Sequence, residues 1–195
     1  IENIQNYNIK QIYQWIYKES PYLIGYLVRG HKKRYPRNYK HRSRMRIYNR
    51  VSVSKRPSEI GERKEAGHWE SDLITSGYNK EALQVNAERV SRYTRINKLK
   101  DKTALENSES LCHSLNIYPA HMRKSITYDN GLENTDHEKV NKILGSKSYF
   151  CEPYHSWEKG TVENTNGLIR RFFPKKTNFS KISDNEIMEV ENWLN

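Results

Sequence analysis

Cysteine and long apolar runs are both scarce in this chain, and each shortage excludes a class of protein. Only two of the 195 residues are cysteines, Cys112 and Cys151, and they form neither a CxxC motif nor the spacing of a metal site. We therefore expect reduced thiols in a cytosolic protein, not a disulfide-rich secreted domain. No run of about 18 apolar residues predicts a membrane span, and the first residues lack the pattern of a signal peptide.

Acidic residues are missing from one long segment, and this absence defines the charge pattern of the chain. Residues 29–56 contain 12 Lys or Arg and no Asp or Glu. Before His68 stand 16 basic and 5 acidic residues, and the remainder contains 18 of each, so the net charge of +11 lies in the first third. Such a segment repels itself and is expected to be extended until it meets a polyanion.

Hydrophobic periodicity predicts an N-terminal helix followed by a mixed α/β domain. Apolar residues at helical spacing favour a helix over residues 4–19, and Pro21 favours its end. Strand patterns cover residues 68–77 and 81–100. Beyond them we predict helices at 102–115, 135–144, 160–173 and 183–194, with strands at 124–128 and 148–151. This order predicts a mixed sheet with helices packed against it.

Three acidic residues occupy positions that suggest chemistry. Asp72 lies inside the first strand pattern, where an unpaired charge is disfavoured. Asp129 stands between a short apolar strand and a Gly turn, where α/β folds present polar groups to a cleft. Glu163 shares one face of its predicted helix with Asn166 and Arg170. Carboxylates from two strands and a helix would form an oxygen site for Mg²⁺ or Mn²⁺, and two such ions can clamp a phosphodiester.

Each of these acids also has a simpler interpretation when it is taken alone. Asp129 in the sequence YDNG is typical of an Asx-type turn. Glu163 could be a solvated helix residue or an ion-pair partner of Arg170. Asp72 could be a charge that protects the edge of a sheet. Only their joint placement favours a metal site.

Three longer blocks of sequence contain these acids and resemble a known family. The chain reads GHWESDLI around Asp72, SITYDNG around Asp129 and YFCEPYHSWEKGTVENTNGLIRRFFPKKTNF around Glu163. Together with AERVSRYT at residues 87–94 and 33 residues between the second and third acids, they resemble the DDE transposases of bacterial insertion sequences, specifically the IS-thirty (IS30) family. The resemblance covers residues 63–195, with weaker similarity over residues 12–57.

The resemblance implies a fold, an enzyme and its cofactor. The fold would be an RNase H-like integrase catalytic core, in which Asp72, Asp129 and Glu163 are the catalytic residues and the metal ligands, holding two Mg²⁺ (or Mn²⁺) ions. The reaction would be metal-dependent DNA cleavage and strand transfer, that is, transposition of an insertion sequence. The expected partners are the terminal inverted repeats and target DNA, bound by a homo-oligomer in the bacterial cytoplasm, associated with the nucleoid.

We expect two domains, both in contact with DNA. Residues 1–63 would be a basic DNA-binding arm, the remnant of a helix-turn-helix region, and residues 64–195 the catalytic core. The expected DNA contacts of the arm are Lys32, Lys33, Arg34, Arg37, Arg42, Arg44 and Arg46. Those of the core are Lys159, which stands where the family has Arg, and Asn166, Arg170 and Arg171.

Two departures from the family pattern keep other functions open. Residues 154–156 read Tyr-His-Ser where the family has Tyr-Ser-Pro, so His155 could approach the scissile phosphate or be a plain loop residue. The family also continues beyond both ends of this chain, so we expect a truncated chain or a split reading frame. The alternative function is therefore a catalytically incompetent, truncated transposase that acts as a DNA-binding regulator. A different RNase H-fold nuclease is a third option, which the block ENTNGLIRR disfavours.

Overall fold

The computed structural model describes residues 8–27, 47–77, 80–153 and 155–195. The chain divides into two compact units, Ile1–Ser43 and Arg44–Asn195. The described part of the first unit contains α1 (Ile9–Glu19) and a 3-10 helix, η1 (Pro21–Tyr26). The N-terminal helix is therefore confirmed over residues 9–19, with its predicted end before Pro21. None of the described helices combines the length and the apolar character needed to cross a membrane.

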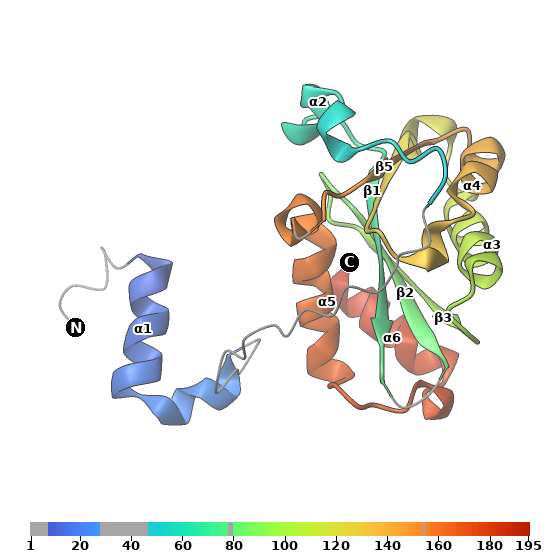
Figure 1. Cartoon of the computed structure of the whole chain (residues 1–195). Coiled ribbons are helices and arrows are strands. Elements are labelled where there is room, and N and C mark those ends of the chain that lie inside the picture. Colours follow the sequence, from blue (N-terminus) through green and yellow to red (C-terminus); the bar gives the residue numbers. More distant parts are fainter. Residues whose placement is uncertain (1–7, 28–46, 78–79, 154) are drawn as a thin grey trace. The chain divides into compact units, whose positions relative to one another are not determined.

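The second unit is built on a mixed five-stranded sheet (Figure 1). Its strands are β1 (His68–Thr75), β2 (Ala82–Glu88), β3 (Thr94–Leu99), β4 (Ser125–Tyr128) and β5 (Lys147–Phe150). The spatial order is β3-β2-β1-β4-β5. The first three strands pair in antiparallel fashion, and β4 and β5 add to β1 in parallel. The predicted mixed sheet is confirmed.

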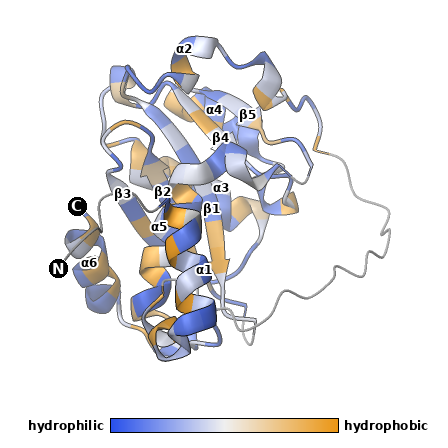
Figure 2. Ribbon diagram, turned by 90° about the vertical axis from the view of Figure 1, so that its left-hand side faces the viewer, coloured by the Kyte–Doolittle hydropathy of each residue, from blue (hydrophilic) through white to orange (hydrophobic). Residues whose placement is uncertain are grey.

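Helices cover both faces of this sheet, as predicted (Figure 1). On one face lie α3 (Ala104–Leu115) and α4 (His137–Leu144), and on the other α5 (Gly160–Phe172) and α6 (Asp184–Leu194). The remaining helical segments are short: α2 (Ser58–Gly61), η2 (Val53–Lys55), η3 (Ala120–Met122), η4 (Leu132–Asn134), η5 (Ser156–Lys159) and η6 (Phe179–Lys181). In Figure 2, α5 and α6 carry both hydrophobic and hydrophilic residues, as expected of helices with one face on a sheet.

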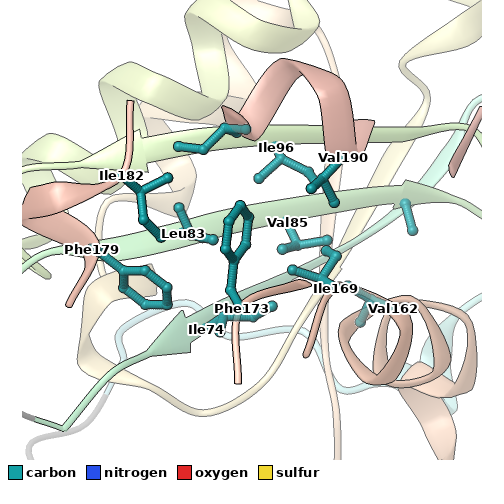
Figure 3. Close-up of a cluster of buried hydrophobic side chains, with 12 residues drawn as sticks. Ile74, Leu83, Val85, Ile96, Val162, Ile169, Phe173, Phe179, Ile182 and Val190 are labelled. Atoms are coloured by element: carbon teal, nitrogen blue, oxygen red, sulfur yellow. The ribbon is translucent and has the colours of Figure 1, made fainter. Parts of the chain in front are cut away.

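The core beneath α5 and α6 is a continuous apolar cluster (Figure 3). Leu83 and Val85 of β2, which are both fully buried, meet Ile169 of α5 and the ring of Phe173 just after it. The first turn of α5 joins this cluster through Val162. Because α5 carries the predicted third acid, this packing fixes the helix, and with it Glu163, relative to the sheet.

Local features mark the end of α4 and the start of α6, close to the predicted positions. Gly145 follows α4 with a φ of 66°, the left-handed conformation that favours glycine. Ser183 and Glu186 form a capping box at the start of α6.

Both edges of the sheet are covered by other parts of the unit. At the β5 edge, Phe150 donates its backbone N–H to the carbonyl of Val51 at 2.8 Å. At the β3 edge, the Glu191 carboxylate of α6 accepts the backbone N–H of Ile96 at 2.6 Å. Such contacts protect part of each edge from pairing with another chain.

The segment before β1 packs on the second unit. Val53 is buried, and Ile47 packs against the cluster formed with α3 and α4. Arg56 donates to the hydroxyl of Thr127 on β4 at 3.1 Å. The second compact unit therefore includes these residues.

Candidate active site

Asp72 and Asp129 occupy equivalent positions on two neighbouring parallel strands. The register of β1 and β4 pairs Glu70 with Thr127. Continued by two residues, it sets Asp72 beside Asp129, the first residue after β4. The Asp72 side chain is 28% exposed and that of Asp129 45%. The parallel pairing of β1 and β4 therefore brings two partly solvated carboxylates together, one from within β1 and one just after β4.

Lys159 lies between these two carboxylates. Its Nζ is 3.1 Å from Asp72 Oδ1 and 3.9 Å from Asp129 Oδ2, and it donates to the carbonyl of Ser71 at 3.0 Å. The residue is only 7% exposed. Burial opposes the charge, but the charges of Asp72 and Asp129 outweigh it, so the pKa of Lys159 is raised. The site therefore holds one buried positive charge facing two acids.

One face of α5 is directed at β1, and Glu163 belongs to that face. Asn166 donates from Nδ2 to Asp72 Oδ2 at 2.7 Å, and Arg170 donates to the carbonyl of Thr75 at 2.7 Å. Glu163, Asn166 and Arg170 follow one another at spacings of three and four residues, which places them on one side of α5, and Lys159 directly precedes the helix. Glu163 lies in the first turn of α5, between two residues that contact Asp72, and is half-buried.

A buried ion pair anchors the start of α5. Glu70 of β1 is fully buried and accepts the backbone N–H of Val162 at 2.9 Å. Its other oxygen accepts from Arg89 Nη1 at 2.7 Å, and Arg89 is itself buried. A carboxylate at a helix N-terminus satisfies a free N–H and complements the helix dipole. Glu70 is not among the site residues predicted from the sequence. A second acidic residue inside the same strand, two positions before Asp72, is the feature that could have indicated it.

A chain of buried amides holds Asp129. Its Oδ1 accepts from the backbone N–H of Gly131 and from Asn134 Nδ2, each at 2.9 Å. Asn134 accepts in turn from Asn107 of α3 at 3.2 Å, and Asn107 accepts from Gln84 of β2 at 2.6 Å. No local pattern in the sequence indicates this network, because its members come from three separate segments.

A fourth acid, Glu133, stands close to the two aspartates. Burial raises its pKa, and the charges of Asp129 and Asp72 raise it further. Its carboxylate lies against Gly131, where an added Cβ would come within 2.2 Å of Glu133 Oε1. Only glycine fits this turn without displacing Glu133.

The donor set for a metal is partly assembled. Asp72 and Asp129 each direct an oxygen at the same positive charge, the Lys159 ammonium. This ammonium takes the place that a metal cation would have between the two acids. Across the described residues, no three His, Cys, Asp or Glu side chains are grouped closely enough to hold a metal ion. The two aspartates therefore fit a divalent ion through the hard oxygen atoms they present, and Glu163 is on the helix face beside them without completing such a group.

The residues predicted to contact DNA fall into three groups. Arg171 is exposed on α5. Lys159, Asn166 and Arg170 instead make contacts within the protein, to the two aspartates and to backbone carbonyls. The predicted contacts of the arm lie outside the described residues: Lys32, Lys33, Arg34, Arg37, Arg42, Arg44 and Arg46.

The loop that departs from the family pattern carries a stacked pair of rings. His155 and Trp157 have centroids 4.3 Å apart and planes inclined by 26°. His155 Nδ1 is 3.3 Å from Glu158 Oε1, and the Trp157 residue is 67% exposed.

Comparison with known proteins identifies the family. No protein-family model matches the chain. It is 38% identical over 173 residues to the transposase for insertion sequence element IS1086 of Cupriavidus metallidurans, covering 89% of this chain and 51% of that protein. It is 37% identical over 175 residues to transposase InsI for insertion sequence element IS30A of Escherichia coli, covering 88% and 45%. The chain belongs to the IS30 family of transposases.

Two further comparisons extend this result. The transposase for IS4351 of Bacteroides fragilis is 34% identical over 198 residues, covering 100% of this chain and 60% of that protein. This IS30-family chain therefore spans about half the length of the curated relatives it matches. A solved simian T-cell lymphotropic virus intasome, in complex with PP2A regulatory subunit B56 gamma, matches 65% of this chain and 47% of its own with a TM-score of 0.54 and 21% identity. That likeness shows the RNase H-like integrase fold, as predicted.

Proposed function

We propose that this chain is the catalytic part of a DDE transposase that cleaves DNA and transfers the cut strand with the help of divalent metal ions. The observation that carries the proposal is the convergence of Asp72 and Asp129 on one cation beneath the α5 face that bears Glu163. The names of the relatives, which are transposases for insertion sequences, support the same conclusion.

Asp72, Asp129 and Glu163 would hold two divalent ions, either Mg²⁺ or Mn²⁺. When bound, such ions activate a water and stabilise the oxygen that leaves phosphorus. Three carboxylates without a metal or another cation would repel one another.

The proposed reaction consists of two phosphoryl transfers. In the first, a water oxygen bonds to a phosphorus at the end of the element and loses a proton, while the bond from that phosphorus to the 3′ oxygen breaks and this oxygen is protonated. In the second, the new 3′-hydroxyl oxygen bonds to a phosphorus of the target DNA and loses its proton, while the 3′ oxygen of the target leaves and is protonated. No covalent bond to the protein forms, so the protein contributes alignment and electrostatic stabilisation.

The neighbouring residues would keep the acids aligned during both steps. Asn166 orients Asp72, Asn134 orients Asp129, and the Glu70–Arg89 pair fixes the start of α5. Partners of this kind fix the geometry of metal ligands and their loss lowers activity roughly 10- to 100-fold.

DNA is the proposed partner, in the form of the element's terminal inverted repeats and the target, bound by more than one copy of the chain. The charge of the first third supports this part of the proposal, because residues 29–56 carry 12 basic and no acidic residues. Such a segment gains affinity by releasing counterions from DNA phosphates. A nucleoid-associated location in the bacterial cytoplasm would follow from this binding.

The test is nicking of a supercoiled plasmid in the presence of Mn²⁺. The unchanged chain should nick, and Glu163→Gln, Asp72→Asn and Asp129→Asn should not, because each removes one negative charge from the proposed metal site. The matched control is Glu189→Gln on α6, which makes the same chemical change at an exposed glutamate and should nick normally. Nicking by Glu163→Gln at the normal rate would contradict the proposal. DNA binding without nicking by the unchanged chain would favour the regulator.

A further inference from the structure

The Lys159 ammonium faces the aspartate oxygens that the proposed metal would need. The inference drawn from this overlap rests on the proposed function. Each aspartate has one oxygen engaged by neutral donors. Asp72 Oδ2 accepts from Asn166, and Asp129 Oδ1 accepts from Gly131 and Asn134. The remaining oxygens, Asp72 Oδ1 and Asp129 Oδ2, are those that face Lys159 Nζ at 3.1 and 3.9 Å.

We propose that the Lys159 ammonium is a built-in counterion that holds Asp72 and Asp129 together before metal binds, and that a divalent ion must displace it. The two oxygens that face Lys159 are the ones that the amide donors leave unengaged, so a divalent ion held by both aspartates would compete with Lys159 for them. A metal–oxygen bond is about 2.0–2.6 Å long for Mg²⁺ and Ca²⁺, whereas the ammonium keeps the oxygens farther away. Lys159 therefore competes with the metal.

The position and the side chain of Lys159 would allow a metal ion to displace its ammonium group. The residue precedes α5, and its flexible four-carbon stem ends in a compact charge. Three groups hold the ammonium: Asp72, Asp129 and the carbonyl of Ser71. A divalent ion offers two positive charges to the same pair of acids, so their attraction favours the exchange. Lys159 thus sets the metal concentration at which the site fills and keeps the acids in place until then.

The experiment measures Mn²⁺ affinity without DNA, from the free-ion electron paramagnetic resonance signal. Lys159→Met keeps most of the stem and removes the charge, so it should bind Mn²⁺ about tenfold more tightly than the unchanged chain, equivalent to about 1.4 kcal/mol. Lys159→Arg restores the charge and should return the affinity toward the unchanged value. The matched control is Lys98→Met, because Lys98 is half-buried and, like Lys159, donates to a carbonyl, in this case that of Ile182 at 2.6 Å. It should leave the affinity unchanged.

A second measurement uses the unchanged chain and so does not depend on how a variant folds. Amine-reactive labelling followed by mass spectrometry reports the accessibility of each lysine. Addition of Mg²⁺ should increase labelling of Lys159 relative to Lys98, because the ammonium leaves its buried position.

The outcomes separate this inference from the proposed function. Equal or weaker Mn²⁺ binding by Lys159→Met, or labelling of Lys159 that Mg²⁺ leaves unchanged, overturns the displacement. The metal site itself would stand in that case, provided that Asp72→Asn abolishes Mn²⁺ binding. Failure of the unchanged chain to bind Mn²⁺ in a manner sensitive to Asp72→Asn would overturn both. Tighter binding by Lys159→Met together with increased labelling supports the exchange.

Discussion

Asn166 of α5 donates a hydrogen bond from Nδ2 to Oδ2 of Asp72 on β1, over 2.7 Å. This bond joins the helix that bears Glu163 to the strand that bears Asp72, two acids that are 91 residues apart in the sequence. It leaves Asp72 Oδ1 directed at Lys159. The amide thus decides which oxygen of Asp72 is available to a cation.

Replacement of Asn166 should lower activity without unfolding the protein. In Asn166→Ala, Asp72 loses the donor that fixes its orientation, so we expect plasmid nicking to fall roughly 10- to 100-fold. Asn166 is half-buried, and the thermal midpoint should change little. The matched control is Asn164→Ala, an exposed asparagine two residues earlier on α5, which should nick at the normal rate. Equal nicking rates for the two variants would show that Asn166 does not orient Asp72 during the reaction.

Loss of the buried carboxylate at Glu70 should destabilise the whole unit. Glu70→Gln leaves Arg89 buried without its counterion and weakens the bond to the N–H of Val162. Breaking one partner of a buried pair costs roughly 3–5 kcal/mol of the free energy of unfolding. Urea unfolding followed by circular dichroism measures this change.

The control for Glu70 is again Glu189→Gln, at an exposed position on α6. It should shift the free energy of unfolding by less than about 0.5 kcal/mol. A Glu70→Gln protein as stable as this control would mean that water or another group compensates Arg89.

Much of the fold follows from local signals in the sequence. The last helix could be predicted because Ser183 and Glu186 form a capping box just before its apolar residues. Asp129 could be singled out because a short buried strand ends immediately before it, and the strand β4 does end at Tyr128. Signals of this kind need only neighbouring residues, so they can be read from one chain.

The electrostatic arrangement of the site could not be predicted in this way. The resemblance makes Lys159 a predicted DNA contact because it stands where the family has Arg, and it gives no sign that the side chain is buried. Its burial depends on Asp72 and Asp129, which reach it only because β1 and β4 pair in parallel. The partnership of Glu70 with Arg89 likewise depends on how β1 and β2 pair and turn. A single sequence contains no record of such contacts.

Acid should weaken the protein through His68 at the start of β1. His68 is buried and its Nδ1 lies 2.7 Å from the hydroxyl of Ser125. Burial lowers the pKa of His68 below its ordinary value of 6.5, and nearby Lys124 lowers it further, whereas Glu65 opposes the shift. The unfolded chain therefore takes up a proton at a higher pH than the folded protein does. Stability is fully present above pH 6.5 and is lost as the pH falls from there toward the lowered pKa.

The free energy of unfolding measured at several pH values checks this prediction. His68→Gln removes the titrating group and should reduce the loss of stability below pH 6.5. His113→Gln is the control, because His113 is an exposed histidine on α3. A pH profile unchanged by His68→Gln would assign the acid sensitivity to other groups.

Salt should weaken DNA binding steeply if the basic segment contacts phosphates. The logarithm of the binding constant falls with the logarithm of the salt concentration, with a slope of about −0.9 for each phosphate contact on duplex DNA. Neutralising four basic residues of the segment should therefore make the slope shallower by about 3.6. The four changes to glutamine are at Lys32, Lys33, Arg34 and Arg37.

An equal change of charge elsewhere distinguishes local contacts from a general effect of net charge. The control replaces four exposed lysines of the second unit with glutamine, at Lys102, Lys142, Lys147 and Lys181. If the segment tracks the DNA backbone, this control should keep most of the slope, because these lysines belong to no predicted contact. If both proteins lose the slope equally, the total charge attracts DNA and the segment has no special position on it. Fluorescence anisotropy of a labelled duplex at several salt concentrations measures both slopes.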